Sequence, residues 1–477
     1  MLITLIGRLV QFALMFASVR IMTQLLSPAD MGRVALITTA TALFALFLVN
    51  PVGMFFNRRL HAWVQQGVAR VRFHLYLVYL AGVCLFASGA LWVAARLGVD
   101  IGGASLTWAA ILICGSIFFS TMVQTLVPSL NMVGRPRAFI ALTLGTLVTG
   151  LVASVLLIHF TGQSAEHWLT GILLAQVLFS LVSYRVFFGA RTAKTHEPSP
   201  LTADKLRQMA KFCGPIAIAV LLQWAHMQGY RFLLAERFGL AQLGLYAAGY
   251  GLAASLMSAA ETILTTWFQP QFYRDVNAED PLRRDRAWAT YASVLIPASL
   301  LAVTALIAAA PSLPRVMLGP AFHGVSDFVV LGALAEWARM MVGMIGLNAH
   351  RHMATRALIV PNILGALATY AAFYALAHTI GMAAAPLAVF LGGLSIVAFL
   401  YGVTYAGDAH MTIDFPRLLP ATATMAACAA LAYASQTWLD LSQRSVPLLA
   451  CLGIGAVWSL LAWRLLKPSF MNRAQHP

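Results

Sequence analysis

Two arginines stand inside apolar stretches of this sequence, where a charge is costly. Arg20 lies in a run that ends near residue 25, and Arg231 lies in a run that ends near residue 236. A charged side chain at membrane depth costs at least ~2.5 kcal/mol on insertion scales, so such residues usually serve a function. A guanidinium group holds two phosphate oxygens at once through its planar fork. Both arginines are therefore suited to binding an anionic group. The alternative is that each side chain snorkels, reaching toward the outer lipid headgroups.

The stretch that carries Arg231 also carries a polar stripe. At a helical rotation of about 100° per residue, Gln223, Tyr230 and Arg231 share one face and His226 lies at its edge. A helix in lipid carries such a stripe only where it faces protein or water. We therefore predict a substrate-binding cavity lined by Arg20, Arg231, Gln223, His226 and Tyr230. The alternative is that Gln223 and His226 only hydrogen-bond a neighbouring helix.

Acidic residues also occur at membrane depth. Glu336 and Arg339 are three residues apart, a spacing that predicts an ion pair on one helix face. Glu261 has no such partner nearby in the sequence. We predict Glu261 and Glu336 as candidate sites for coupling to H+ or Na+, with a purely structural ion pair as the alternative for Glu336. No other cofactor is expected.

Several function classes lack their sequence signals. The sequence contains no GxxxxGK[ST], HExxH or GxSxG motif, so we do not expect an enzyme. The five cysteines lie in apolar runs without a CxxC pair, so no metal site is expected. The net charge of +15 comes from basic residues in short loops between apolar runs. Membrane topology explains such a distribution better than nucleic-acid binding does.

Membrane helices must position these side chains. Of 477 residues, 60% are hydrophobic and only 10% are charged, and the mean hydropathy is +0.79. A soluble domain carries roughly 25% charged residues, and a spanning helix needs about 20 mostly apolar ones. The sequence predicts an all-α polytopic membrane protein of about fourteen transmembrane helices. Their predicted ranges are 3–25, 33–56, 72–96, 106–130, 137–160, 167–189, 210–236, 242–268, 288–310, 326–349, 356–379, 382–405, 418–437 and 445–465.

Basic residues give the orientation. Most of the 31 Lys and Arg residues fall in alternate loops between the predicted helices. The positive-inside rule places these loops, and with them both termini, in the cytoplasm. An even number of helices is required for this arrangement, and fourteen satisfies it.

The sequence also indicates an internal duplication. Gln11 and Gln223 are 212 residues apart, as are Gly32 and Gly244. Six helices in each copy predict two pseudo-symmetric lobes of the same orientation, related by a pseudo-two-fold axis along the membrane normal. The predicted organisation is an N-lobe over 1–189, a cytoplasmic linker over 190–209, a C-lobe over 210–405, and two further helices with a cytoplasmic tail over 406–477.

The order of motifs around Arg231 is similar to that of a known family. Gly214-Pro215 comes first, an apolar run follows Arg231, and Gly244-Leu245-Tyr246 and Pro270 come next. The first copy carries Arg20 and the segment Ser27-Pro28-Ala29-Asp30-Met31-Gly32. Over about residues 1–405 the chain resembles the Wzx-type polysaccharide biosynthesis proteins, which are lipid-linked oligosaccharide flippases of the multidrug/oligosaccharidyl-lipid/polysaccharide exporter (MOP) superfamily. Where members often carry an acidic residue before the basic one, this chain has Tyr230.

The resemblance implies two six-helix lobes in a V shape, with two extra helices, in the bacterial inner membrane. It implies a substrate of oligosaccharide on polyprenyl pyrophosphate, moved between leaflets by alternating access for surface or exopolysaccharide synthesis. Expected partners are this substrate, membrane lipid, and a polysaccharide polymerase and export proteins, with no nucleic acid. Three alternatives stay open: a cation-coupled multidrug antiporter, a peptidoglycan-precursor flippase, and a non-transporting scaffold subunit of an export machine.

Overall fold

The structure is a computed structural model that describes residues 2–98, 102–189, 203–351, 359–407, 415–436, 438–441, 443 and 445–474. Across these ranges the regular secondary structure is helical, and no strand occurs. Within the described residues, thirteen helices are long and apolar enough to cross a membrane, and a shorter apolar helix, Val10–Leu25, precedes them. The predicted all-α fold with about fourteen membrane helices is confirmed, and the chain is a multi-pass membrane protein.

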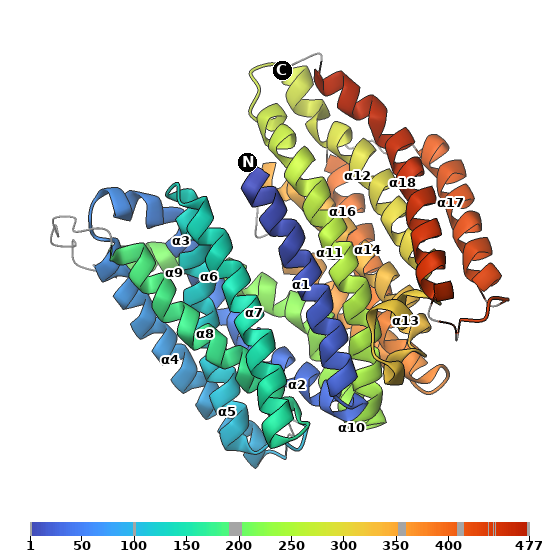
Figure 1. The fold of residues 1–477 in the computed structure, drawn as a ribbon. Coiled ribbons are helices and arrows are strands. Elements are labelled where there is room, and N and C mark those ends of the chain that lie inside the picture. Colours follow the sequence, from blue (N-terminus) through green and yellow to red (C-terminus); the bar gives the residue numbers. More distant parts are fainter. Residues whose placement is uncertain are drawn as a thin grey trace. The chain divides into compact units, whose positions relative to one another are not determined.

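The chain forms two compact units, Met1–Gly244 and Leu245–Pro477 (Figure 1). The helices of the first unit are α1 (Leu2–Leu25), α2 (Pro28–Phe44), α3 (Asn50–Gln65), α4 (Ala69–Arg96), α5 (Leu106–Gly115), α6 (Thr121–Met132), α7 (Pro136–Thr161), α8 (Ala165–Phe188), α9 (Ala203–Trp224) and α10 (Arg231–Phe238). Helix α11 (Leu240–Val276) begins in the first unit and continues in the second.

The second unit contains the remaining helices. These are α12 (Pro281–Ala309), α13 (Leu313–Met317), α14 (Ser326–Arg351), α15 (Ile359–Leu376), α16 (Ala384–Gly407), α17 (Phe415–Gln436) and α18 (Ser445–Ala474). The division between the units falls at Gly244, and α9 packs on α3 within the first unit. Most of the linker predicted over 190–209 lies outside the described residues, and the four predicted domain ranges stay a prediction.

Side-chain caps fix where several helices begin. Ser27, Ser105 and Ser164 each accept a hydrogen bond from the backbone N–H three residues later, at the starts of α2, α5 and α8. Such a cap satisfies one of the N–H groups that a helix start leaves without an intrahelical partner. A proline in the first turn of α2 and of α12 reinforces the start, since its missing N–H is not needed there.

Three membrane-spanning stretches of the first unit are interrupted by a π-helical turn. The turns are Ala45–Val49 between α2 and α3, Ser116–Ser120 between α5 and α6, and Ala225–Gly229 between α9 and α10. A π turn disturbs the regular backbone ladder and is frequent at functional sites. At the first turn, the hydroxyl of Tyr79 on α4 donates to the carbonyl oxygen of Leu48 at 2.8 Å.

Arginine contacts agree with the predicted sides of the membrane. Arg70 and Arg135 donate to the carbonyls of Phe188 and Val186, at 3.0 and 3.1 Å, at the end of α8. These arginines come from loops assigned to the cytoplasm, and a cation stabilises a helix C-terminus. On the opposite side of the unit, Arg33 donates to the carbonyl of Gly102 at 2.9 Å, which joins two loops assigned to the outside.

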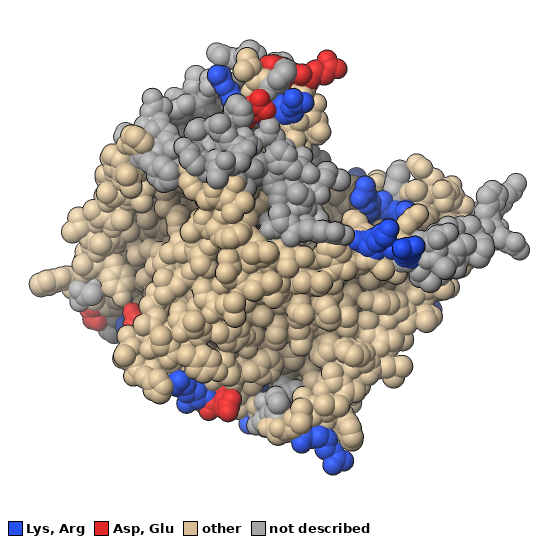
Figure 2. Space-filling model, turned by 180° about the vertical axis from the view of Figure 1, so that it is seen from behind, with Lys and Arg blue, Asp and Glu red and all other residues tan. Residues whose placement is uncertain are grey.

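Charged side chains are sparse over the middle of the helices. Figure 2 shows a face on which the coloured charged side chains lie toward the edges of the view, while uncharged residues cover its middle. Large apolar side chains such as Leu85, Phe160 and Leu431 are more than 70% exposed. In a chain of this composition, exposed apolar side chains are the surface that faces lipid.

The last two helices pack on α12 of the second unit. Gln436 of α17 is buried, donates to the carbonyl of Ala308, and accepts from the hydroxyl of Ser312. Trp458 of α18 donates to the hydroxyl of Thr304 at 3.1 Å. These bonds across helices tie α17 and α18 to the rest of the unit.

Gln436→Leu is expected to loosen this attachment. The substitution leaves the buried Ala308 carbonyl and Ser312 hydroxyl without their partner, which costs about 1–3 kcal/mol. The thermal unfolding midpoint of the purified protein in detergent should fall by several degrees. Ser435→Ala, at the exposed neighbouring position, is the matched control and should leave the midpoint unchanged. Equal midpoints for both variants would contradict the assigned role.

Candidate functional site

Arg231 lies where α10 of the second copy contacts α2 (Pro28–Phe44) of the first copy. Arg231 is the first residue of α10, directly after the π turn, and its side chain is half-buried. Its Nη1 donates a long hydrogen bond, 3.4 Å, to the hydroxyl of Thr39 on α2. The indole N–H of Trp224 donates to the backbone oxygen of the same threonine at 3.1 Å. A fully buried threonine from the first copy thus holds two residues of the second.

The predicted cavity residues do not share one level of exposure. His226 and Tyr230 are buried, at 3% and 1% exposure, whereas the side chain of Gln223 is exposed. The π turn explains the difference, because the predicted stripe assumes a uniform rotation from residue 223 to residue 231. Arg20 is half-buried on α1. The binding roles of these residues stay a prediction.

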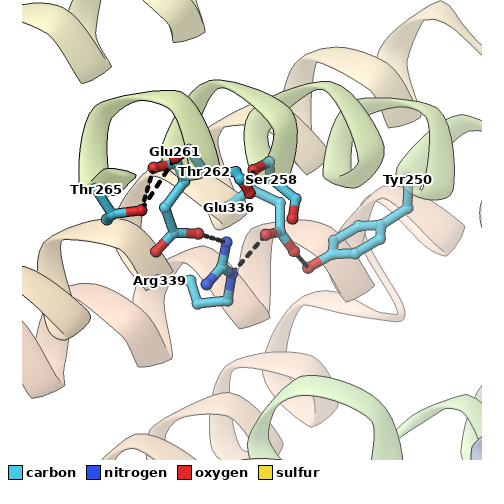
Figure 3. A network of polar contacts seen from close by, with 7 residues as sticks. All are labelled: Tyr250, Ser258, Glu261, Thr262, Thr265, Glu336 and Arg339. Carbon is cyan, nitrogen blue, oxygen red and sulfur yellow. Dashed lines mark hydrogen bonds and ion pairs between the residues drawn. The ribbon is translucent and has the colours of Figure 1, made fainter. Parts of the chain in front are cut away.

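A charged cluster occupies the second unit (Figure 3). Arg339 of α14 contacts two carboxylates at once. Its Nη2 lies 2.6 Å from Oε2 of Glu261 on α11, and its Nε lies 2.6 Å from Oε2 of Glu336 on its own helix. The hydroxyl of Tyr250 donates to Oε1 of Glu336 at 2.7 Å. The predicted ion pair of Glu336 and Arg339 is confirmed, and Glu261, which has no partner nearby in the sequence, has one across the helix interface.

Close approach of α11 and α14 makes this cluster possible. A Cβ placed on Gly332 would lie 3.2 Å from the Cα of Tyr250 and 3.3 Å from the Cβ of Ala253. Glycine at this position therefore lets α14 lie against α11. Glu336 follows one turn later, within reach of the Tyr250 hydroxyl.

The cluster carries more negative than positive charge. Two carboxylates share one guanidinium, which gives a formal charge of −1 when all three groups are ionised. The side chain of Glu336 is 6% exposed, while those of Glu261 and Arg339 are 27% and 26% exposed. The exposed edge at Glu261 is where a proton or a monovalent cation can reach the excess charge. Groups of this kind at membrane depth are typical of ion and proton pathways.

Sequence reasoning missed two residues of these sites. Thr39 sits in an apolar run, and a threonine there usually bonds its own helix backbone, so its type gave no signal. Tyr250 lies 86 residues from its partner Glu336. Trp337 of α14 donates to the hydroxyl of Ser299 at 3.2 Å within the second unit.

A family model described as polysaccharide biosynthesis protein matches residues 21–327. This range is more than half of the chain. The chain belongs to this family. The region shared with the polysaccharide biosynthesis proteins includes Arg231, Gly244 and Glu261 and ends before Glu336 and Arg339. The resemblance inferred from the motifs is confirmed.

Solved structures show the same fold. An inward-facing multidrug resistance MATE family transporter of the MOP superfamily matches with a TM-score of 0.63 at 15% identity, over 84% of this chain and 96% of that one. The lipid II flippase MurJ, in an inward closed conformation, matches with a TM-score of 0.63 at 11% identity, over 98% of this chain and all of that one.

A third match is a mutant form of the MATE transporter VcmN of Vibrio cholerae, with a TM-score of 0.53 at 13% identity over 85% and 95% of the two chains. No match was found among curated proteins. This member of the polysaccharide biosynthesis family therefore has the fold of the MATE and MurJ proteins.

Proposed function

We propose that this protein is a flippase that moves oligosaccharide linked to polyprenyl pyrophosphate from the inner to the outer leaflet of a bacterial inner membrane. The observation that carries the proposal is the family match over residues 21–327, which spans the second-copy motif with Arg231. A polysaccharide precursor is built on a lipid carrier and must cross the bilayer. The fold of this chain is one that also serves a lipid II flippase.

The chemistry around Arg231 supports an anionic headgroup. Its half-buried guanidinium donates to the hydroxyl of Thr39 through a long bond, and a hydroxyl is a neutral acceptor. A pyrophosphate offers a charged acceptor, and bonds between charged groups are roughly twice as strong as neutral ones. Arg20 lies 211 residues before Arg231, one residue from the offset of the duplication, and adds charge of the same sign. Both arginines are proposed to face a hydrated cavity that opens alternately to the two sides.

Deletion and complementation test this function in cells. Loss of the gene should abolish the surface or exported polysaccharide and cause its lipid-linked precursor to accumulate with the sugar on the cytoplasmic side. Restoration by the intact gene is expected. A deletion strain that exports the polysaccharide normally and shows no such accumulation would rule out this substrate.

A second candidate substrate is a lipid-linked peptidoglycan precursor. The lipid II flippase MurJ suggests it, because the match between the two structures covers the whole MurJ chain. Depletion of this protein would then stop cell-wall synthesis rather than polysaccharide export.

A multidrug antiporter is less well supported, because the paired arginines give the wrong sign of charge for cationic drugs. A scaffold subunit would tolerate loss of Arg231.

The charged cluster is proposed as the coupling site for H+ or Na+. The excess negative charge shared by Glu261, Glu336 and Arg339 can be neutralised by one proton or one monovalent cation. Tyr250 adds a hydroxyl beside Glu336. Of Glu261, Glu336 and Arg339, only Glu261 is both partly exposed and paired with a single oppositely charged group.

Glu261→Gln is expected to slow export several-fold and to flatten its dependence on pH. The amide is isosteric but does not titrate, so a step that protonates residue 261 is lost while packing is kept. Export by cells held at different external pH values, with protein levels matched, measures the profile. Thr262→Val, an exposed neighbour on the same helix, is the control. A Gln variant with the wild-type pH profile would remove Glu261 as the coupling group.

A further inference from the structure

The two copies of the duplicated motif touch each other. Gly32, in the first turns of α2, and Gly244, in the first turns of α11, hold the same position in the two copies and are both buried. Helices α2 and α10 lie side by side in the first unit, and the corner from α10 into α11 meets the start of α2 (Figure 1). The feature that revealed the duplication in the sequence is therefore also a contact in space.

Only glycine fits at either position. A Cβ on Gly32 would overlap the carbonyl oxygen of Leu240 and lie 2.9 Å from its carbonyl carbon. A Cβ on Gly244 would overlap the carbonyl oxygen of Pro28 and lie 2.9 Å from the backbone nitrogen of Gly32. Each conflict is with backbone, which a rotamer change does not relieve. Small residues of this kind allow two membrane helices to come into backbone contact.

The contact follows the internal symmetry of the chain. Pro28 and Leu240 are also 212 residues apart, so Leu240 is the second-copy counterpart of Pro28. Gly32 meets Leu240, and its counterpart Gly244 meets Pro28. A contact in which each partner repeats the other's role is isologous and lies on a local two-fold axis. Copies that enter the membrane in the same orientation share an axis along the membrane normal, as the duplication predicts.

Neighbouring groups place this contact at the outer end of the helices. They also fix the start of α2, which is the part of the contact that belongs to the first copy. Asp30 pairs with Arg33 at 3.2 Å, and Arg33 also donates to the carbonyl of Gly102 in a loop assigned to the outside. A Cβ on Gly102 would lie 3.4 Å from Cδ2 of Leu240, so Gly102 lies beside the contact. The hydroxyl of Ser27 caps α2 and bonds the carboxylate of Asp30 at 2.6 Å.

We propose that Gly32 and Gly244 are the two halves of an outer gate, closed when their backbones touch as they do here. The gate opens when the start of α2 separates from the start of α11. This inference rests on transport by alternating access, as proposed above, but not on the identity of the substrate. At Gly32 and Gly244 the two motifs meet through backbone atoms, so the closed contact leaves no room for a side chain at either position. A side chain at either glycine blocks closure and favours the outward-open state.

Thiol labelling from outside tests the gate. Thr39, fully buried and two turns inward of Gly32 on α2, is replaced by cysteine in a variant in which the five native cysteines are alanine. A membrane-impermeant maleimide is added to intact cells. We expect Gly32→Ala or Gly244→Ala to raise the rate of labelling at the cysteine in position 39 by about ten- to a hundredfold. Overpacking of this severity shifts the equilibrium from the closed to the outward-open state by about that factor. Gly251→Ala is the matched control, since a Cβ there meets no atom within 4 Å.

Unchanged labelling in both alanine variants, with normal amounts of protein in the membrane, would overturn the gate. Labelling needs no substrate, so a wrong substrate assignment leaves this result standing. Should the alanine variants not accumulate, Ala29→Cys and Ala241→Cys, in the two facing turns, are combined and bridged with a short bifunctional maleimide. The bridge should stop export, whereas a monofunctional maleimide should not. Export through the bridged protein would equally overturn the gate.

Discussion

Replacing Arg231 by alanine is expected to abolish polysaccharide export while leaving the protein in the membrane. Each charge-assisted hydrogen bond to an anionic ligand contributes about 1.5–3 kcal/mol, so loss of a bidentate contact should lower transport at least about a hundredfold. The bond of Arg231 to Thr39 is a long one, 3.4 Å, to a neutral hydroxyl, and the amount of the variant in the membrane is measured alongside export. Export per cell, normalised to membrane protein, is the measurement.

Two further variants separate charge from geometry. Arg231→Lys keeps the charge but loses the planar fork, and it should restore only part of the export. Arg237→Ala removes an exposed arginine from the same helix and should leave export unchanged. Wild-type export in the Arg231→Ala variant would exclude a role for this residue in binding the substrate.

Arg339→Ala is expected to have the largest effect on stability. It leaves the carboxylates of Glu336 and Glu261 without their shared cation, and breaking a buried pair by removing one partner costs about 3–5 kcal/mol. The exposed edge at Glu261 lets water screen part of this, so the lower end, about 3 kcal/mol, is expected. The thermal unfolding midpoint in detergent should fall by several degrees.

A second substitution should reverse much of that loss. Adding Glu336→Gln to Arg339→Ala removes the more deeply buried of the two unpaired charges while the amide still accepts from Tyr250. The double variant should be more stable than Arg339→Ala alone, since residues of one network are coupled rather than additive. Arg284→Ala, at an exposed position in the first turn of α12, is the control. A double variant no more stable than the single one would show that the charges are not coupled.

Hydropathy was enough to predict the helices, because each membrane crossing needs a long apolar run and the runs are separated by charged loops. Predicted ranges such as 72–96 and 137–160 lie close to α4 (Ala69–Arg96) and α7 (Pro136–Thr161). The π turns left no such signal, since they depend on local backbone packing rather than on residue type. For this reason the sequence did not show that Gln223 is exposed while His226 and Tyr230 are buried, and a shared cavity for these three residues stays a prediction.

Contacts between distant residues set the limit of sequence reasoning about the sites. The pair of Glu336 and Arg339 was predictable because both lie within one turn of one helix. Glu261 lies 78 residues from Arg339, and only the packing of α11 on α14 brings them together. Likewise, the duplication was visible at Gly32 and Gly244, but the sequence did not show that the two copies of the motif touch.

Reconstitution of the purified protein tests the central claim most directly. Liposomes are prepared with a labelled oligosaccharide on polyprenyl pyrophosphate in both leaflets, and an impermeant glycosidase is added outside. The intact protein should bring nearly all of the substrate to the enzyme. The Arg231→Ala variant and protein-free vesicles should leave the inner-leaflet half protected. Full protection of that half by vesicles containing the intact protein would contradict the proposal that this chain carries lipid-linked oligosaccharide across the membrane.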